Sequence, residues 1–320
     1  MHPPTLVVHA DWSSGSAKRW MARASRGADG VYRAGAPEPV GDLATFFDRL
    51  RGAAGDGGCV LLGVDFPIGL PLAHARKAGI TSFPDALAEF GAGEWRRFYE
   101  VCSTPQEISL HRPFYPARPG GARQQHLLAG LGAASMDALR RQCERAYPGR
   151  RAAAPLFWTL GGQQVGKAAI SGWRDLLGPA LRSGRPGLLL WPFAGRLDRL
   201  CAPGHIVVAE SYPAEFYGHL GVVLRSGGRG GGKRVQSVRK ANGLVLSAWA
   251  ARAGVELDPL LTGQLQDGFG GAPDGEDRFD AVVGLFGMLN VVLGRQPPGE
   301  VSDGPLRAIE GWILGQAVSR

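Results

Sequence analysis

Three short apolar segments of this 320-residue chain each end in one carboxylate, and this pattern limits the folds open to it. The segments are Leu6–Asp11, Cys59–Asp65 and His205–Glu210. A short, continuous apolar run that stops at polar or turn-forming residues is typical of a strand buried on both faces. Such strands belong to open α/β sheets, in which the carboxyl ends of the strands converge on the crevice where ligands bind.

The beginning of the chain predicts the element order β-β-β-α-β. Two further strand-like segments follow the first apolar run, at residues 18–24 and 31–34. Apolar residues at helical spacing then cover 41–50, with Asp42 as the expected N-cap. Cys59–Asp65 supplies the last strand of the series. We therefore expect three antiparallel strands, a crossover helix and a parallel strand.

The middle of the chain has a different texture, because helical fragments alternate there with connections rich in proline and glycine. The expected helices cover 84–98, 135–147 and 166–182. We predict an α/β core made of residues 1–66 and 204–320, with a large, mostly helical insertion at 67–203. In the second part of the core, a helix is expected over 234–253, after a glycine-rich basic loop at 225–233.

The predicted insertion also carries the positive charge of the chain. The formal net charge is +8, and the stretch from Arg76 to Arg199 holds 18 Lys and Arg against 9 Asp and Glu. Aromatic residues alternate with cations at 95–99 and 111–115. Nucleic acid or another phosphorylated partner would explain this composition, since basic side chains release counterions from phosphates and aromatic rings stack on bases. A solvated basic surface with its aromatic residues in a core is the open alternative.

The sequence predicts a protein of the cytoplasm that does not enter a membrane. Its longest apolar stretch, 281–294, is interrupted by Asn290 and is too short to span a bilayer. The N-terminal residues lack the pattern of a signal peptide. The four cysteines form no C-x-x-C pair and the seven histidines are dispersed, so a metal site would have to use oxygen ligands.

A further carboxylate, Asp280, begins an apolar helix expected over 281–293, and Asp277 lies one turn before it on the same side. If these acids meet Asp11, Asp65 and Glu210, several negative charges crowd into one cleft. Carboxylates so close raise one another's pKa unless a cation lies between them. All-oxygen ligation suits Mg²⁺ or Mn²⁺. Each acid taken alone is equally typical of a turn or a helix cap.

Five segments together resemble the domain of unknown function 429 family, whose members are predicted RNase H-like nucleases. They are HADWSS (9–14), GVDFPIGLP (63–71), VVAESYPAEFYGHLG (207–221), EDRFDAVVGLFGML (276–289) and EGWILG (310–315). The resemblance implies an RNase H-like core, a mixed five-stranded sheet flanked by helices, with acids that coordinate divalent metal.

Residue by residue, the family's acids correspond to Asp11, Asp65, Glu210 and Asp280. Asp277 is similar to the paired acids in the last helix of Holliday-junction resolvases, which share this fold more distantly. The family's basic pair corresponds best to Lys233 and Arg239.

From these residues we expect metal-dependent hydrolysis of phosphodiester bonds by a two-metal mechanism. Asp11 would anchor the cations and the other acids, Asp65, Glu210, Asp277 and Asp280, would complete their coordination. Lys233 or Arg239 would neutralise charge on the phosphoryl oxygens.

Three other functions stay open. The segment Asp11–Lys18 resembles the first phosphate-binding turn of a phosphotransferase of the actin and sugar-kinase type. A non-catalytic nucleic-acid-binding protein would need only the basic insertion. A small-molecule enzyme would use the insertion as a lid over the substrate, with 163–167 or 173–174 near the acids. Glu310 is compatible with a supporting role at the site or with a simple cap.

Overall fold

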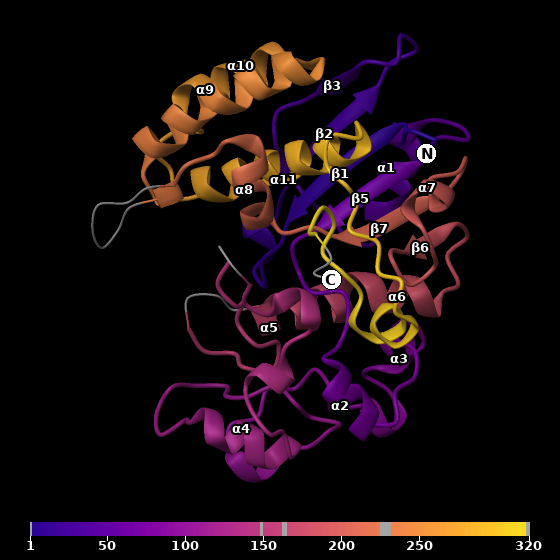
Figure 1. Cartoon of the computed structure of the whole chain (residues 1–320), viewed down its shortest axis with the longest axis vertical. Coiled ribbons are helices and arrows are strands. Elements are labelled where there is room, and N and C mark those ends of the chain that lie inside the picture. The colour runs from indigo at the N-terminus through magenta and orange to yellow at the C-terminus, as the bar shows by residue number, and fades with distance from the viewer. Residues whose placement is uncertain (1, 148–149, 162–164, 225–231, 318–320) are drawn as a thin grey trace. The chain divides into compact units, whose positions relative to one another are not determined.

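We describe a computed structural model of the chain, covering residues 2–147, 150–161, 165–224 and 232–317. The chain divides into two compact units. Unit 1 comprises Met1–Asp65, Ala194–Gly299 and Ile313–Ser319, and unit 2 comprises Phe66–Phe193 and Glu300–Trp312. Figure 1 labels the elements of both units.

Unit 1 contains a mixed sheet, in which the strand order is β7-β5-β1-β2-β3-β8 and β4 pairs with β2. Strand β1 is antiparallel to β2 and parallel to β5, and β5 is parallel to β7. The strands are β1 (Leu6–Asp11), β2 (Trp20–Arg26), β3 (Tyr32–Ala34), β4 (Glu38–Pro39), β5 (Val60–Val64), β7 (Ile206–Glu210) and β8 (Val255–Leu257). The predicted α/β class is therefore confirmed.

The burial of the strands follows their place in the sheet. All residues of β1 and β5 are buried, as expected for central strands covered on both faces. In β2, by contrast, buried and more exposed residues alternate. The continuous apolar runs in the sequence therefore correspond to the middle of the sheet, where the carboxyl ends of β1 and β5 lie side by side.

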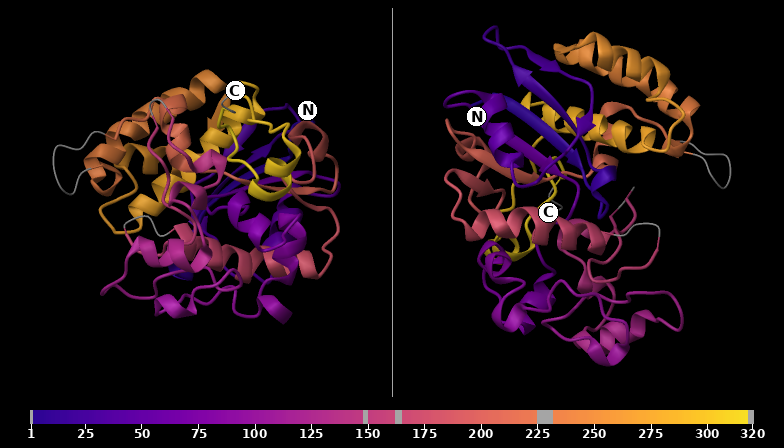
Figure 2. Two further views of the ribbon diagram at one scale, coloured as in Figure 1. Left: turned by 60° about the horizontal axis from the view of Figure 1, so that its bottom comes forward. Right: turned by 180° about the vertical axis from the view of Figure 1, so that it is seen from behind.

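Helix α11 (Gly275–Val292) is the most deeply buried helix of unit 1, and it packs on β1 and β2. A Cβ atom added to Gly284 would lie 2.2 Å from the ring of His9, so only glycine lets the helix approach β1 so closely. Figure 2 shows α11 running along the sheet. The other helices of unit 1 are α1 (Phe46–Ala54), α7 (Leu197–Leu200), α8 (Pro213–Leu220), α9 (Gln236–Ala253) and α10 (Pro259–Asp267).

Helix α1 begins later than predicted. The side chain of Asp42 accepts hydrogen bonds from the Ala44 N–H and the Thr45 hydroxyl, in a turn that precedes the helix. Asp42 was expected to cap the helix, but it stabilises this turn instead. The predicted elements before and after it, β3 and β5, lie within one or two residues of their expected positions.

Among the described residues of unit 2, nearly all regular elements are helical, as expected for the insertion. Its longer elements are α2 (Leu72–Lys77), α3 (Phe83–Glu89), α4 (Gln124–Leu131), α5 (Val165–Gly172), α6 (Gly178–Arg182), the strand β6 (Leu188–Leu190) and π-helical turns at Trp173–Leu177 and Leu306–Glu310. Some aromatic residues of the two charged segments pack into a core: the ring of Phe98 stacks on that of Phe90, with centroids 3.7 Å apart. Phe98 and Phe114 also pack edge to face. Phe98, Phe114 and Tyr115 are therefore buried and not available to stack on bases, whereas Trp95 and Tyr99 are half-buried.

The helix expected at 135–147 is wrong. That segment holds two short 3₁₀ turns, Asp137–Leu139 and Gln142–Glu144. The Glu144 carboxylate accepts a hydrogen bond from the Arg141 N–H, and such a local bond competes with helix propagation.

Two segments belong to a different unit from the one predicted for them. Residues 194–203 lie in unit 1, and 300–312 lie in unit 2. The second placement has a clear physical basis, because the carboxylate of Glu310 accepts hydrogen bonds from the N–H groups of Leu72 and Gln142. Over the described residues, every helix is too short or too polar to cross a bilayer.

Candidate functional site

Asp11 and Asp65 are neighbours at the carboxyl edge of the sheet in unit 1. Ala10 of β1 pairs with Val64 of β5, so the next residue of each chain segment is an aspartate at the same level. Besides burial, the charge of Asp65 raises the pKa of Asp11, so the two carboxyl groups are close enough to interact. The Trp12 N–H also donates to Asp65 Oδ1 at 2.5 Å. The strand register thus brings together two acids that are 54 residues apart in the sequence.

Asp280 reaches the same place from α11. It lies one turn before Gly284, which contacts His9, and His9 lies two residues before Asp11 on the same face of β1. Both oxygens of Asp280 are engaged. The Tyr217 hydroxyl donates to Oδ1 at 3.1 Å, and the Lys233 ammonium forms a short ion pair with Oδ2.

Lys233 is the cation of this group, and it has a second carboxylate partner. Its Nζ lies 3.3 Å from Glu276 Oε1, one turn before Asp280. Asp277, the other predicted acid of α11, is partly buried next to Glu276. We call Asp11, Asp65, Asp277, Asp280 and Lys233 the acidic cluster.

Burial and mutual repulsion raise the pKa of every acid in the acidic cluster. Burial is the main cause for Asp65, whose pKa rises to about 7, and for Asp277, whose pKa rises to about 6. The pKa of Asp11 is raised well above its ordinary value by burial and by the charges of Asp65 and Asp280. Burial also raises the pKa of Asp280, although its bonds to Lys233 and Tyr217 act in the opposite direction. One lysine does not offset this many carboxylates.

The same crowding keeps Lys233 charged. Burial disfavours its ammonium form, but the charges of Asp280, Glu276 and Asp11 together outweigh burial and raise the Lys233 pKa. Lys233 is therefore a fixed positive charge among the acids over the whole physiological pH range.

Glu210 does not join the acidic cluster, contrary to expectation. It is paired with Val64, which is paired with Ala10, and residues in lateral register point to the same face of a sheet. This is the face opposite to that of His9 and α11. The residue that follows, Ser211, corresponds to Asp65 and Asp11, and its Oγ lies close to Gly63 on the α11 face.

Arg239, the second predicted cation, also lies outside the acidic cluster. Its guanidinium is buried and donates to the backbone oxygens of Lys233 at 2.6 Å, Gly268 at 2.8 Å and Gly270 at 2.6 Å. It therefore holds the backbone of the turn that carries Lys233. We correct its predicted role from neutralising phosphate charge to positioning Lys233.

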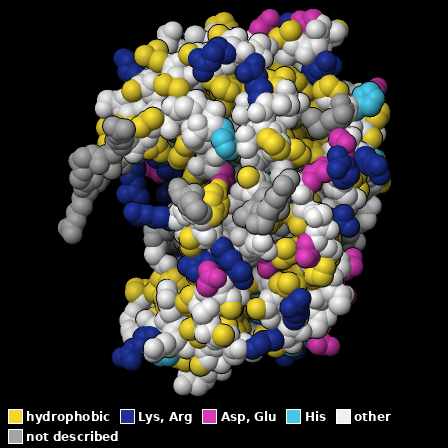
Figure 3. Space-filling view, in the orientation of Figure 1, with side chains coloured by type: hydrophobic (Ala, Val, Ile, Leu, Met, Phe, Trp, Pro, Cys, Tyr) yellow, Lys and Arg dark blue, Asp and Glu magenta, His cyan; other side chains and the backbone are white. Residues whose placement is uncertain are grey.

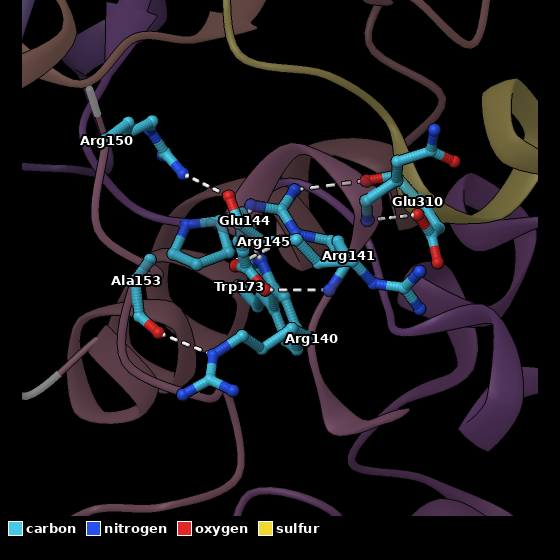
Figure 4. Close-up of polar contacts among 10 residues, drawn as sticks. Arg140, Arg141, Glu144, Arg145, Arg150, Ala153, Trp173 and Glu310 are labelled. Carbon is cyan, nitrogen blue, oxygen red and sulfur yellow. Dashed lines mark hydrogen bonds and ion pairs between the residues drawn. The ribbon is translucent and has the colours of Figure 1, made fainter. Parts of the chain in front are cut away.

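Glu310 belongs to a different cluster, in unit 2 (Figure 4). Its carboxylate is held by the two N–H groups noted above, and its carbonyl oxygen accepts a hydrogen bond from Arg141 Nη1 at 3.0 Å. Arg141 also donates three hydrogen bonds to the Glu144 carboxylate, from its backbone N–H, Nε and Nη2. We call these three residues the arginine cluster; Arg141 is fully buried. Glu310 is a structural residue of unit 2.

Some predicted positions lie outside the described residues. These include Gln163 and Gln164 and most of the expected glycine-rich loop, 225–231. Lys167 lies in α5 and Trp173 donates its Nε1–H to the Pro67 oxygen at 2.7 Å, both within unit 2.

The chemistry of the acidic cluster fits a hard divalent cation, because the atoms that it offers as ligands are carboxylate oxygens. The arrangement of these side chains, however, does not form a complete metal site. Throughout the described residues, no group of three or more His, Cys, Asp or Glu side chains is arranged to hold a metal ion. In addition, the Lys233 ammonium already forms an ion pair with Asp280 Oδ2.

Three contributors to the site were missed by sequence reasoning. Tyr217 binds Asp280, Glu276 binds Lys233, and Ser211, directly after β7, has the position level with Asp65 where an acid was expected. A signal existed for two of them: Tyr217 lies one helical turn after Pro213, and Glu276 lies one turn before Asp280. The position of Ser211 depends on strand register, which the sequence does not display.

Comparisons with known proteins add no relative. No protein-family model, no curated protein and no solved structure matches the chain. The similarity to the domain of unknown function 429 family therefore stays a prediction from the short motifs.

Proposed function

We propose that unit 1 is an RNase H-like core whose acidic cluster binds Mg²⁺ or Mn²⁺ and hydrolyses phosphodiester bonds of nucleic acid. The observation that carries the proposal is the convergence of Asp11, Asp65 and Asp280 from three separate elements at the carboxyl edge of the sheet. Crowding of buried carboxylates opposes folding, and a divalent cation is the ligand best able to reverse that effect.

The connectivity of the sheet supports the fold part of the proposal. Five of its strands, in the order β3-β2-β1-β5-β7, form a mixed sheet with α1 between β4 and β5 in the chain. Helix α11 covers the face on which the acids lie. A mixed five-stranded sheet flanked by helices is what the family resemblance implies.

The proposal gives each residue of the acidic cluster a task. Asp11, Asp65 and Asp280, with Asp277, would hold the cation. When bound there, a divalent ion would make water a better nucleophile and stabilise the leaving oxygen. Lys233 would neutralise charge on a phosphoryl oxygen, and the Tyr217 hydroxyl fixes the orientation of the Asp280 carboxyl group.

Unit 2 supports nucleic acid as the substrate through its exposed cations. Many of its arginines are paired with acids, such as Arg97 with Glu100 and Arg174 with Asp175. Others are exposed and form no ion pair with the described residues: Arg76, Arg96, Arg118, Arg123 and Arg151. Figure 3 shows Lys and Arg side chains on the visible face of the molecule. Such unpaired cations are available to phosphates.

The test compares Asp11→Asn with Asp56→Asn, the same substitution at an exposed aspartate of unit 1 outside the acidic cluster. Wild type and Asp56→Asn should cleave DNA, RNA or branched substrates when Mn²⁺ or Mg²⁺ is added, and Asp11→Asn should lose about 10³-fold or more of that rate. Mn²⁺ should also raise the melting temperature of the wild type, and by much less in Asp11→Asn.

Two results would contradict the proposal. One is the absence of metal-dependent cleavage by the wild type on every substrate class. The other is an equal Mn²⁺-induced shift in melting temperature for Asp11→Asn and Asp56→Asn, because the acidic cluster would then not bind the metal.

A further inference from the structure

The turn between β1 and β2 has the chemistry of an anion site. We propose that the segment Ser13–Lys18, which begins two residues after Asp11, binds a phosphoryl group of the substrate through backbone N–H groups, hydroxyl groups and the Lys18 ammonium. The inference rests on the proposed function for its substrate class, but its physical basis is independent of the acids.

Arg19 fixes the direction of the peptide groups in this turn. It is buried, its Nε donates to the Ser13 oxygen at 2.7 Å and its Nη2 lies 3.4 Å from the Ser14 oxygen. Its guanidinium stacks 4.4 Å from the centroid of the Trp12 ring. With both carbonyl oxygens held by Arg19, the N–H groups of the same two peptides point the opposite way, because C=O and N–H are antiparallel in a trans peptide.

These N–H groups are free to bind a ligand. The Gly15 N–H has only a long contact, 3.4 Å, to Ser13 Oγ. The Ser14 N–H has no acceptor within the described part of the chain. Successive N–H groups that point to one side of a turn form a concave site for anions.

The side chains of the turn add donors and no negative charge. Residues 14–18 are exposed, and they include the hydroxyl groups of Ser14 and Ser16 and the ammonium of Lys18. Lys18 is close enough to the acidic cluster to affect it. Burial and the charges of Glu276 and Asp280 raise the pKa of Asp277, and Lys18 acts against that rise.

The position of this turn next to the acidic cluster favours a phosphoryl ligand over other anions. The turn is continuous with β1, and the N–H of Trp12 between them already binds Asp65. A simple carboxylate or a free sulfate ion bound here would present no ester bond for the neighbouring acids to hydrolyse. A phosphodiester bound here through its non-bridging oxygens also carries P–O ester bonds, which are the bonds that the proposed function of Asp11 and Asp65 would hydrolyse.

The closing experiment uses a proline substitution that removes one N–H donor. Gly15 has φ −89°, close to the value that proline imposes, and its position has open space for a side chain. Gly15→Pro therefore deletes the donor, whereas Gly15→Ala keeps it and serves as the matched control. Lys18→Ala, with Lys18→Arg as its rescue, tests the ammonium independently and does not depend on the proline variant folding.

Binding of inorganic pyrophosphate, ATP and a single-stranded oligonucleotide is measured by calorimetry on the full chain, with EDTA and with Ca²⁺. At least one probe should bind about tenfold more weakly to Gly15→Pro and to Lys18→Ala than to the wild type, because each variant loses a hydrogen bond to a charged group. Gly15→Ala and Lys18→Arg should bind within about twofold of the wild type. A preference for the oligonucleotide would identify the phosphoryl group as a phosphodiester, and a preference for ATP would identify it as that of a free nucleotide.

Failure of this inference can be told apart from failure of the proposed function. If the wild type cleaves nucleic acid but Gly15→Pro binds every probe as tightly as Gly15→Ala, the turn is not an anion site. If the effect of Gly15→Pro persists in EDTA while no substrate is cleaved, the turn binds phosphoryl groups and the nuclease proposal is wrong.

Discussion

The two units each bury a group of charged side chains, but the two groups are bonded very differently. In the arginine cluster of unit 2, four N–H groups of Arg141 reach carboxylate or carbonyl oxygens, and both oxygens of Glu310 accept backbone N–H groups. In the acidic cluster of unit 1, burial and the neighbouring carboxyl groups raise the pKa of Asp11, and Lys233 alone pairs with both Asp280 and Glu276.

This difference distinguishes a charged group that is satisfied within the protein from one that we propose binds a ligand. Buried charges stabilise a fold only when their hydrogen bonds are complete, which is the state of Arg141. Neutral residues in place of some of the acids of unit 1 would remove repulsion from the folded state, and a ligand that supplies positive charge would remove it as well.

Removal of Arg141 should have the largest effect on stability. Arg141→Ala leaves Glu144 buried without its partner and should lower the free energy of unfolding by about 3–5 kcal/mol. Arg145→Ala, which breaks an exposed ion pair with Asp137, should change it by less than about 0.5 kcal/mol. Urea unfolding followed by circular dichroism measures both. Equal losses in the two variants would show that the arginine cluster has no special structural role.

The pH dependence of stability should differ in sign between Asp65 of unit 1 and His74 of unit 2. Burial raises the folded-state pKa of Asp65 from 3.8 to about 7, so its contribution is full below about pH 4 and is lost as the pH rises to about 7. Burial lowers the pKa of His74 from 6.5 to about 3, so its contribution is full above about pH 6.5 and is lost as the pH falls.

Urea unfolding of wild type, Asp65→Asn and His74→Leu between about pH 4 and 8 isolates the two contributions. Relative to the wild type, Asp65→Asn should become more stable as the pH rises, and His74→Leu should become more stable as the pH falls. Leucine is a suitable replacement because neither ring nitrogen of His74 has a hydrogen-bond partner among the described residues. Variant curves that run parallel to the wild-type curve would contradict both assignments.

The smallest effect is expected for Tyr217→Phe. This variant removes the hydroxyl that binds Asp280 Oδ1 and leaves the ring in place, so the free energy of unfolding should change by about 1 kcal/mol or less. If the proposed function is correct, the cleavage rate should fall by about tenfold, since Asp280 loses its fixed orientation. Phe216→Tyr is not a useful control because Phe216 packs on Gly287. His219→Phe, at the end of the same helix, is suitable because it has no role in the acidic cluster.

The sequence was sufficient to predict the central strands and two of their acids. Asp11 and Asp65 follow fully buried apolar runs, which only central strands of an α/β sheet contain. Glu210 follows a similar run, but the strand register places it level with Val64 and not with Asp65. A shift of one residue moves a side chain to the other face of a sheet, and register depends on long-range pairing.

The role of Arg239 was also predicted wrongly from the sequence, although the sequence pattern around it indicated the correct role. Arg239 shares a helical stripe with Asn242, Leu246 and Trp249, all of which are buried in α9. A cation in such a stripe is more suited to binding carbonyl oxygens inside the protein than to binding a substrate. Lys233 precedes the helix and is not part of this stripe, so its different location agrees with the sequence pattern.

Gly284 connects the architecture of unit 1 to the chemistry proposed for it. The separation between α11 and β1 is limited by the contact of this glycine with the His9 ring, and the same helix carries Asp280 toward Asp11. A single methyl group at position 284 would push the helix outward and widen the gap between the acids one turn away. If the acidic cluster binds a metal ion as proposed, a substitution of Gly284 would therefore weaken that binding, although Gly284 has no ligand atom of its own.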